Sequence, residues 1–297
     1  MTSLPLSGCS TALVTPFTAD GALDEAALTS LVAWQVAEGI HGLVPCGSTG
    51  EAATLSLEER RRVVRLTVET VAGRIPVIAG AGGNDTRVAI ETSKAMAAEG
   101  ATHLLHVSPM YSKPPQRGIL AHFRAIADAS PLPIVVYNVP GRTGSNIEAE
   151  TTLALAAHAN IVAVKEASGN LAQITQIIRH APAGFRTLSG DDGLTLAVIA
   201  GGGHGLISVV SNAAPAAMSR LCDLARTGDM EAARALHLQL HNISQTAFCE
   251  SNPIPIKAAL AMMGRIGNNL RLPLVPMNTS HEPALKAALV EAGVLSA

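Results

Sequence analysis

The segment from residue 134 to residue 166 decides the fold. It begins with Ile134-Val-Val-Tyr-Asn138 and ends with Ile161-Val-Ala-Val-Lys-Glu166, and a helix-like stretch lies between them at 148–158. Both short runs are almost continuously apolar, which is typical of parallel strands covered on both faces. A strand, a helix and a second strand in this order predict a parallel β-α-β unit.

The same unit recurs along the chain. We predict strands at 10–15, 42–45, 76–80, 103–108, 134–138, 161–166, 186–189 and 205–209. Helical patterns follow at 24–38, 56–71, 86–99, 116–127, 148–158, 171–180, 193–200 and 213–227, and Ser56-Leu-Glu-Glu59 has the form of a capping box. Eight such units favour the α/β class and a (β/α)8 TIM barrel over residues 1–227.

After residue 227 the strand patterns stop. Helices are predicted at 229–246, 255–263 and 281–291, so we expect residues 228–297 to form a C-terminal helical domain. A doubly wound open sheet is the alternative, but it usually carries a Gly-rich dinucleotide fingerprint after its first strand. Here Gly80-Ala-Gly-Gly83 follows the third predicted strand, and Asp85 stands at the last fingerprint position.

Composition excludes several classes of protein. The chain has 297 residues, a net charge of -2, 48% hydrophobic residues and 15% charged residues, so it is not intrinsically disordered. Aromatic residues make up only 2% and no long basic run occurs, which argues against a nucleic-acid partner. We expect neither a membrane span nor a secretory signal, because no apolar window is long enough and the first residues lack a basic segment.

Cysteine usage points to the cytoplasm. Cys9, Cys46, Cys222 and Cys249 lie far apart and form no Cys-x-x-Cys pair. They fit neither a zinc site nor a disulfide framework. We interpret them as buried thiols in a reducing compartment.

Two residues stand at the ends of neighbouring predicted strands, where barrel enzymes carry their chemistry. Lys165 ends an apolar strand, and burial there would lower its pKa and supply a free amine that can form a Schiff base. Tyr137 ends the preceding strand and could transfer protons during imine formation. The alternatives are a solvated lysine and a core tyrosine. Tyr111, the other tyrosine of the chain, also follows a predicted strand.

Two further features could bind a carboxylate. The turn Gly47-Ser-Thr-Gly-Glu51 offers backbone N–H groups and two hydroxyls before a helix. Arg142 could clamp a substrate carboxylate through paired hydrogen bonds. An ordinary small-residue turn and a surface arginine are the alternatives.

A metal site is not predicted. His103 and His106 are three apart on a predicted strand, so they point to opposite faces. His237 and His241 share a helix face but lack a carboxylate partner in the pattern.

Taken together, the motifs resemble the dihydrodipicolinate synthase / N-acetylneuraminate lyase family of Schiff-base aldolases. The resemblance runs from Thr11 to Leu274. It rests on the motifs at 47–51, 137–144, 164–169, 189–192, 202–208 and 252–257. The family fold is a (β/α)8 barrel with a helical C-terminal domain, which agrees with the pattern described above.

The resemblance implies roles for individual residues. Lys165 would form the Schiff base with pyruvate, with no other cofactor, and Tyr137 would transfer protons. Ser48 and Tyr111 would complete a hydroxyl relay, in which Tyr111 comes from a neighbouring subunit of a homotetramer built as a dimer of dimers.

Substrate contacts follow from the same resemblance. Thr49 would bind the pyruvate carboxylate, in a pocket lined by Gly190 and by the backbone around Ile207. Arg142 would bind the carboxylate of a small aldehyde substrate. The run at 137–144 favours the synthase branch, which condenses pyruvate with aspartate 4-semialdehyde in lysine biosynthesis.

Two departures keep other activities open. Ser48 and Met110 stand where many synthases carry threonine and tyrosine. The alternatives are a pyruvate-dependent aldolase acting on a sugar-derived 2-keto acid and a non-catalytic ligand sensor on the same fold. The presence of both Lys165 and Tyr137 argues against the sensor.

The resemblance also bears on regulation by lysine. Asn84 keeps its place in the expected lysine pocket. Val88, Leu57 and Met110 stand where lysine-sensitive relatives carry glutamate, histidine and tyrosine. Without the carboxylate, an ammonium group loses its main partner, so we predict weak or absent inhibition by lysine.

Overall fold

The computed structural model describes residues 6–296, so residues 1–5, which were considered above for a leader, lie outside it. Eight strands form a single parallel sheet: β1 (Gly8–Ala12), β2 (Gly42–Val44), β3 (Ile78–Gly80), β4 (His103–Val107), β5 (Ile134–Asn138), β6 (Ile161–Glu166), β7 (Arg186–Ser189) and β8 (Gly205–Ser208). The strand order runs β2-β1-β8-β7-β6-β5-β4-β3, and a parallel bridge between Leu43 and Val77 joins its two ends. The predicted barrel is confirmed.

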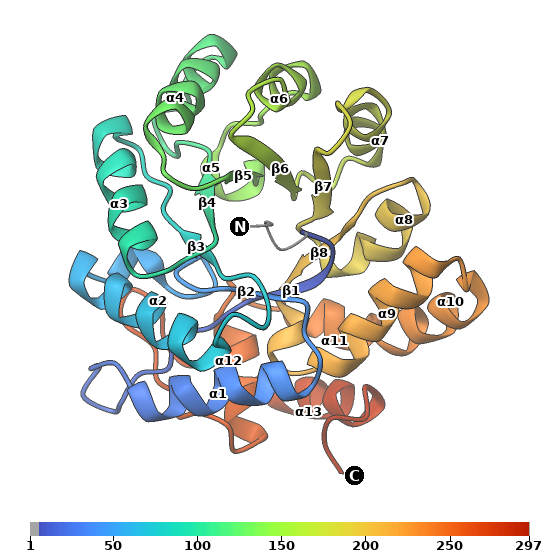
Figure 1. The fold of residues 1–297 in the computed structure, drawn as a ribbon. Helices are drawn as coiled ribbons and strands as arrows, with labels where there is room; N and C mark the ends of the chain where they lie inside the picture. The colour runs from blue at the N-terminus through green and yellow to red at the C-terminus, as the bar shows by residue number, and fades with distance from the viewer. Residues whose placement is uncertain (1–5, 297) are drawn as a thin grey trace.

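Helices surround the ring of strands (Figure 1). They are α1 (Glu25–Ala37), α2 (Leu57–Val71), α3 (Thr86–Ala98), α4 (Gln116–Ala129), α6 (Ala149–Ala156), α7 (Leu171–His180), α8 (Thr195–Ala200) and α9 (Pro215–Thr227). The predicted capping box begins α2: Glu59 N–H donates to Ser56 Oγ, and Ser56 N–H donates to the Glu59 carboxylate. Both bonds satisfy backbone donors that the first helical turn leaves unpaired.

Inward-facing side chains fill the barrel. The interior cluster contains Ala12, Val44, Ile78, Leu105, Val135, Tyr137, Ala163, Leu188 and Ile207, each contributed by one of the eight strands, with β5 contributing two. Side chains alternate along a strand, so Asn138 and Glu166, one residue beyond Tyr137 and Lys165, point outward. Tyr137 on β5 is in register with Lys165 on β6, and the sheet therefore fixes them as neighbours.

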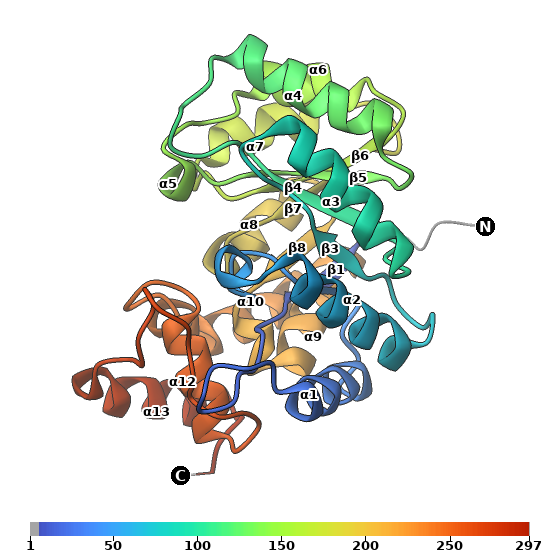
Figure 2. The same ribbon diagram turned by 90° about the vertical axis from the view of Figure 1, so that its left-hand side faces the viewer.

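Four more helices follow the barrel: α10 (Met230–Gln239), α11 (His241–Thr246), α12 (Ile254–Met262) and α13 (Glu282–Glu291). Figure 2 shows α12 and α13 at the lower left of the barrel. The largest hydrophobic cluster runs without a break from barrel residues such as Leu13 to C-terminal residues such as Leu285. A boundary at residue 228 remains a prediction.

Some boundaries differ from the prediction. Strand β1 occupies 8–12 rather than 10–15, because Gly8 already pairs with Gly205 of β8. The helix expected at 229–246 divides at Leu240, which ends α10 and begins α11. The short helix α5 (Pro140–Thr143) was missed, because its Pro-Gly start is typical of a turn.

Cys249 is the exception to the expectation of buried thiols. Cys9, Cys46 and Cys222 are buried, whereas Cys249 is exposed in the turn after α11. Within residues 6–296, no helix has the length and apolar character that a membrane crossing requires.

Candidate active site

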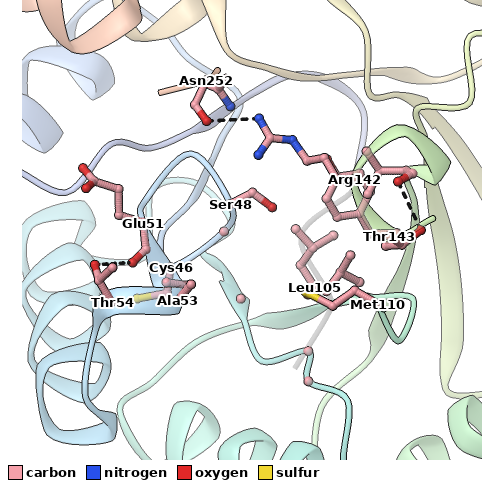
Figure 3. Close-up of a pocket in the computed structure, with 18 of the residues that line it drawn as sticks. Cys46, Ser48, Glu51, Ala53, Thr54, Leu105, Met110, Arg142, Thr143 and Asn252 are labelled. Carbon is pink, nitrogen blue, oxygen red and sulfur yellow. Dashed lines mark hydrogen bonds between the residues drawn. The ribbon is translucent and has the colours of Figure 1, made fainter. Parts of the chain in front are cut away.

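A cavity of about 540 Å³ opens where the carboxyl ends of the strands meet the C-terminal segment (Figure 3). Its lining includes Ser48, Tyr137 and Arg142, three of the residues singled out from the sequence. Asn252 and Pro273 close it from the C-terminal side. The barrel and the C-terminal helices therefore build this site together.

Lys165 lies next to the cavity rather than on its surface. Its side chain is buried, and its Nζ is 4.2 Å from the centre of the Tyr137 ring, which does line the cavity. Burial lowers the pKa of Lys165 to about 7, the carboxylate of Asp192 raises it, and the guanidinium of Arg142 lowers it. Near pH 7 about half of this amine is therefore unprotonated and able to attack a carbonyl.

Tyr137 is also buried, with 6% of its surface exposed. Burial raises the pKa of its hydroxyl to about 12, although Arg142 acts in the opposite direction. The hydroxyl therefore stays protonated at neutral pH and can donate or relay a proton. The structure confirms that Tyr137 lies beside Lys165.

Some backbone N–H groups of the turn at 47–51 already have hydrogen-bond partners within the turn. The N–H groups of Gly50, Glu51 and Ala52 donate to carbonyls within the turn. It leads into a short 3-10 helix (Ala52–Thr54), and α2 begins only at Leu57, so the expected helix N-terminus is absent from this position. Ser48 Oγ points into the cavity (Figure 3). Among the described residues, the N–H groups of Ser48 and Thr49 have no acceptor, which leaves them available to a carboxylate.

Thr49 lies behind the cavity surface and is 3% exposed. Its Oγ1 accepts a hydrogen bond of 2.8 Å from Asn252 Nδ2. Arg142 lies on the opposite wall and donates 3.0 Å to the backbone oxygen of Asn252 (Figure 3). One residue of the C-terminal segment thus contacts both expected carboxylate-binding residues.

Gly190 packs against the Lys165 side chain, whereas Ile207 lies in the barrel interior. A Cβ at Gly190 would lie 2.6 Å from Ala167 Cβ and 3.1 Å from Lys165 Cε, so a larger residue here would crowd both side chains. Ile207 belongs to the interior cluster that also contains Tyr137. Neither residue lines the main cavity in this chain.

Tyr111 is not brought into this chain's own site. It is 92% exposed, and its backbone is left-handed with φ of 68°. Its N–H donates 3.1 Å to Thr143 O, which holds it at the cavity edge. Met110 beside it does line the cavity, and its N–H donates to Asn84 Oδ1 at 2.8 Å.

The residues of the expected lysine pocket divide between two hollows. Asn84 and Met110 line the main cavity, whereas Leu57 and Val88 line a neighbouring hollow of about 420 Å³. Arg60 lines both hollows. Val88 is 58% exposed and brings no carboxylate to the hollow, whereas Glu91, three residues further along α3, also lines it.

Three sets of buried contacts around the cavity were not predicted from the sequence: those of Asp192, the pair of Glu51 with Lys257, and those of Asn252. Asp192 is fully buried, and its carboxylate accepts from Ser208 Oγ at 2.5 Å and Val209 N–H at 3.0 Å. Burial raises the pKa of Asp192 to about 6. Glu51 and Lys257 form a fully buried ion pair at 2.5 Å. Asn252 and Lys257 lie in the motif at 252–257, but the motif gave no sign of which barrel residues they meet.

No group of three or more His, Cys, Asp or Glu residues within 6–296 is arranged to hold a metal ion. His106 is buried against Ser93, and His103 bonds to Thr102. Burial lowers the pKa of both rings. These contacts assign the two histidines to the framework of the barrel.

Comparison with known proteins agrees with this geometry. Residues 5–292 match the model of the dihydrodipicolinate synthetase family. The chain is 50% identical to 4-hydroxy-tetrahydrodipicolinate synthase of Koribacter versatilis over 98% of both chains. It is 41% identical to the chloride-inhibited dihydrodipicolinate synthase of Acinetobacter baumannii in complex with pyruvate, with a TM-score of 0.96 and coverage of 98% and 100%.

A third relative is the dihydrodipicolinate synthase of Cyanidioschyzon merolae, whose crystal structure has lysine bound. It is 43% identical, with a TM-score of 0.94 and coverage of 97% and 99%. A family match over nearly the whole chain, supported by relatives of this similarity, leaves no ambiguity about kinship. The chain belongs to the dihydrodipicolinate synthetase family.

Proposed function

We propose that the protein is a 4-hydroxy-tetrahydrodipicolinate synthase, a Schiff-base lyase that condenses pyruvate with L-aspartate 4-semialdehyde. The observation that carries this proposal is the buried amine of Lys165, with a pKa lowered to about 7, next to the Tyr137 ring at the cavity. Relatives that are 46% and 50% identical over nearly their whole length carry this activity in their names. The enzyme would serve lysine and diaminopimelate biosynthesis in the cytoplasm.

The first half of the reaction uses Lys165 and the hydroxyl groups. The Nζ lone pair attacks C2 of pyruvate, a C–N bond forms, and the carbonyl oxygen takes a proton. A second proton transfer lets that oxygen leave as water and produces the iminium ion. Tyr137, with its hydroxyl protonated at neutral pH, is placed to supply and recover these protons, and Ser48 extends the relay into the cavity.

The second half forms the carbon–carbon bond. Loss of a C3 proton converts the iminium ion to an enamine, whose C3 attacks the aldehyde carbon while the aldehyde oxygen takes a proton. The amino group of the second substrate then replaces Nζ at C2, which closes the ring and frees Lys165. No cofactor is needed, because the iminium ion formed on the lysine accepts the electron pair that the C3–H bond leaves behind.

Each substrate carboxylate would have its own binding site. Thr49 and the free N–H groups of the turn would hold that of pyruvate, near Gly190 and Ile207. Arg142 would hold that of the aldehyde from the opposite wall, through the donors that Asn252 leaves unoccupied.

We further propose a homotetramer built as a dimer of dimers, in which Tyr111 enters the partner's relay. Tyr111 is 92% exposed, and apolar Leu57, Val88 and Met110 are exposed around the same edge. Sedimentation analysis should therefore show a tetramer. A fully active monomer would contradict this assembly.

A coupled assay tests the activity. Pyruvate and aspartate 4-semialdehyde, supplied with the reductase that consumes the product, should give steady turnover. Borohydride added with pyruvate alone should inactivate the enzyme and leave its added mass on the peptide that contains Lys165. Labelling without condensation would assign the chain to another pyruvate-dependent aldolase, and no labelling would overturn the Schiff-base mechanism.

A further inference from the structure

Three hydrogen bonds join the C-terminal segment to the turn at 47–51. Asn252 Nδ2 donates 2.8 Å to Thr49 Oγ1, Lys257 Nζ donates 2.5 Å to Glu51 Oε1, and Arg271 N–H donates 3.1 Å to Glu51 Oε2. The first of these reaches a residue that is expected to touch substrate. It is therefore the contact most directly coupled to the chemistry.

A threonine hydroxyl has one proton to donate and two lone pairs that accept. Asn252 Nδ2 occupies a lone pair of Thr49 Oγ1 and offers it no acceptor through the same contact. The hydroxyl proton is consequently left for another partner. A bound carboxylate, which only accepts, is the partner that this orientation favours.

The side chain of Asn252 is buried beside Thr49. Asn252 is 6% exposed, and its backbone oxygen accepts from Arg142 at 3.0 Å. Its Oδ1 is buried and has no hydrogen-bond partner among the described residues. An unpaired buried amide oxygen destabilises a fold, so this side chain is not explained by stability alone.

From this geometry we infer that Asn252 is a positioning residue for 2-oxo acid binding, which directs the Thr49 hydroxyl proton toward the pyruvate carboxylate. The inference rests on the proposed function. It assigns a task in the reaction to the C-terminal segment, which supplies no atom to the covalent step. The backbone contact with Arg142 places the same residue between the sites for the two substrates.

Two substitutions separate this role from a structural one. Asn252→Ala removes the donor, but it keeps the backbone oxygen that holds Arg142. Asn252→Asp keeps the shape, but its carboxylate only accepts. It would draw the Thr49 proton away from the substrate and place a negative charge near the pyruvate carboxylate.

The two variants should rank differently in KM for pyruvate than loss of packing alone would rank them, because packing alone would make alanine the more damaging substitution. We expect Asn252→Ala to raise the KM for pyruvate about tenfold, and Asn252→Asp to raise it further, with a smaller change in the KM for the aldehyde. Asn252→Asp, the closer isostere, should nevertheless unfold at the higher temperature of the two. The pyruvate dependence of borohydride labelling should shift with the KM.

Asn269→Ala is the matched control. Asn269 also belongs to the C-terminal segment and donates 2.9 Å to the barrel, but its acceptor is Phe17 O, which does not line the cavity. This variant should keep the wild-type KM for pyruvate. Each variant is assayed as the full chain, beside its thermal unfolding curve.

The outcomes are distinguishable. Wild-type pyruvate dependence in both Asn252 variants, or a larger effect of alanine than of aspartate, would overturn the positioning role while the proposed function stands. A wild-type chain that pyruvate and borohydride leave unlabelled would overturn both.

Discussion

The candidate active site has a buried wall and an exposed rim, and they are built in different ways. The buried wall consists of Lys165 and Tyr137, on paired strands, with 4% and 6% of their surfaces exposed. The exposed rim consists of Met110 and Tyr111, with 40% and 92% exposed. Both residues of the wall come from one chain, whereas nothing within residues 6–296 of the same chain covers Tyr111 at the end of the rim. The covalent step should therefore belong to a single chain, and the proton relay to two.

The largest effect should come from removing the amine of the buried wall. Lys165→Arg keeps a positive charge, but a guanidinium stays protonated and cannot attack pyruvate. We expect activity to fall by a factor on the order of 10⁴ and borohydride labelling to disappear. Lys257 is an internal reference in the wild-type peptide map, because it is buried but paired with Glu51 and should carry no label.

Removal of the hydroxyl of the wall should have the next largest effect. Tyr137→Phe keeps the ring that packs on Lys165 but cannot relay protons. We expect kcat to fall by roughly 10²-fold, the usual contribution of a general acid or base, with a smaller change in the KM for pyruvate. An unchanged rate of iminium formation, measured by rapid quenching with borohydride, would contradict this role.

The rim can be tested by mixing subunits. Tyr111→Phe should reduce activity by about 10- to 100-fold. Exchange with inactive Lys165→Ala subunits should restore up to about a quarter of wild-type activity, since half of the dimers are then hybrids with one complete site each. Tyr137→Phe mixed with Lys165→Ala should recover nothing, because both residues belong to one chain's wall. Recovery in both mixtures, or in neither after demonstrated exchange, would remove the distinction between wall and rim.

The pH dependence of Schiff-base formation should follow the protonation of Lys165 in the buried wall. The pKa of Lys165 is lowered to about 7, so the unprotonated amine predominates above that pH and decreases about tenfold per unit below it. The rate of labelling by pyruvate should fall accordingly as pH decreases through 7. Asp192→Asn removes the charge that raises the Lys165 pKa and should move this acid limb to lower pH. A shift to higher pH would show that Asp192 acts in another way.

The smallest effect is expected at the hollow beside the rim. Val88 and Leu57 offer no carboxylate to the ammonium groups of lysine. We expect less than about twofold inhibition of the coupled assay by millimolar lysine. Half-inhibition below about 1 mM, which corresponds to roughly 4 kcal/mol of binding, would show that other groups replace the missing carboxylate.

The sequence predicted the wall better than the contacts that support it. Lys165 and Tyr137 could be placed together because each ends an apolar run, and neighbouring parallel strands end at the same edge of the barrel. Asn252 and Thr49 are 203 residues apart, and Lys257 and Glu51 are 206 apart. No periodicity links such distant positions. The division of the predicted helix at Leu240 was missed too; α11 packs against the distant helix α13, and local propensity carries no information about such contacts.

The buried pair of Glu51 and Lys257 has a consequence for the order of events during translation. Glu51 leaves the ribosome 206 residues before Lys257. At typical rates of synthesis it waits roughly 10 to 40 s for its partner. Until then, the Glu51 carboxylate lacks both C-terminal donors that hold it in the finished chain, the Lys257 ammonium and the Arg271 N–H. The turn that carries Ser48 and Thr49 should therefore reach its final conformation only when the chain is nearly finished, so nascent chains that stall early would be inactive even where their strands have paired.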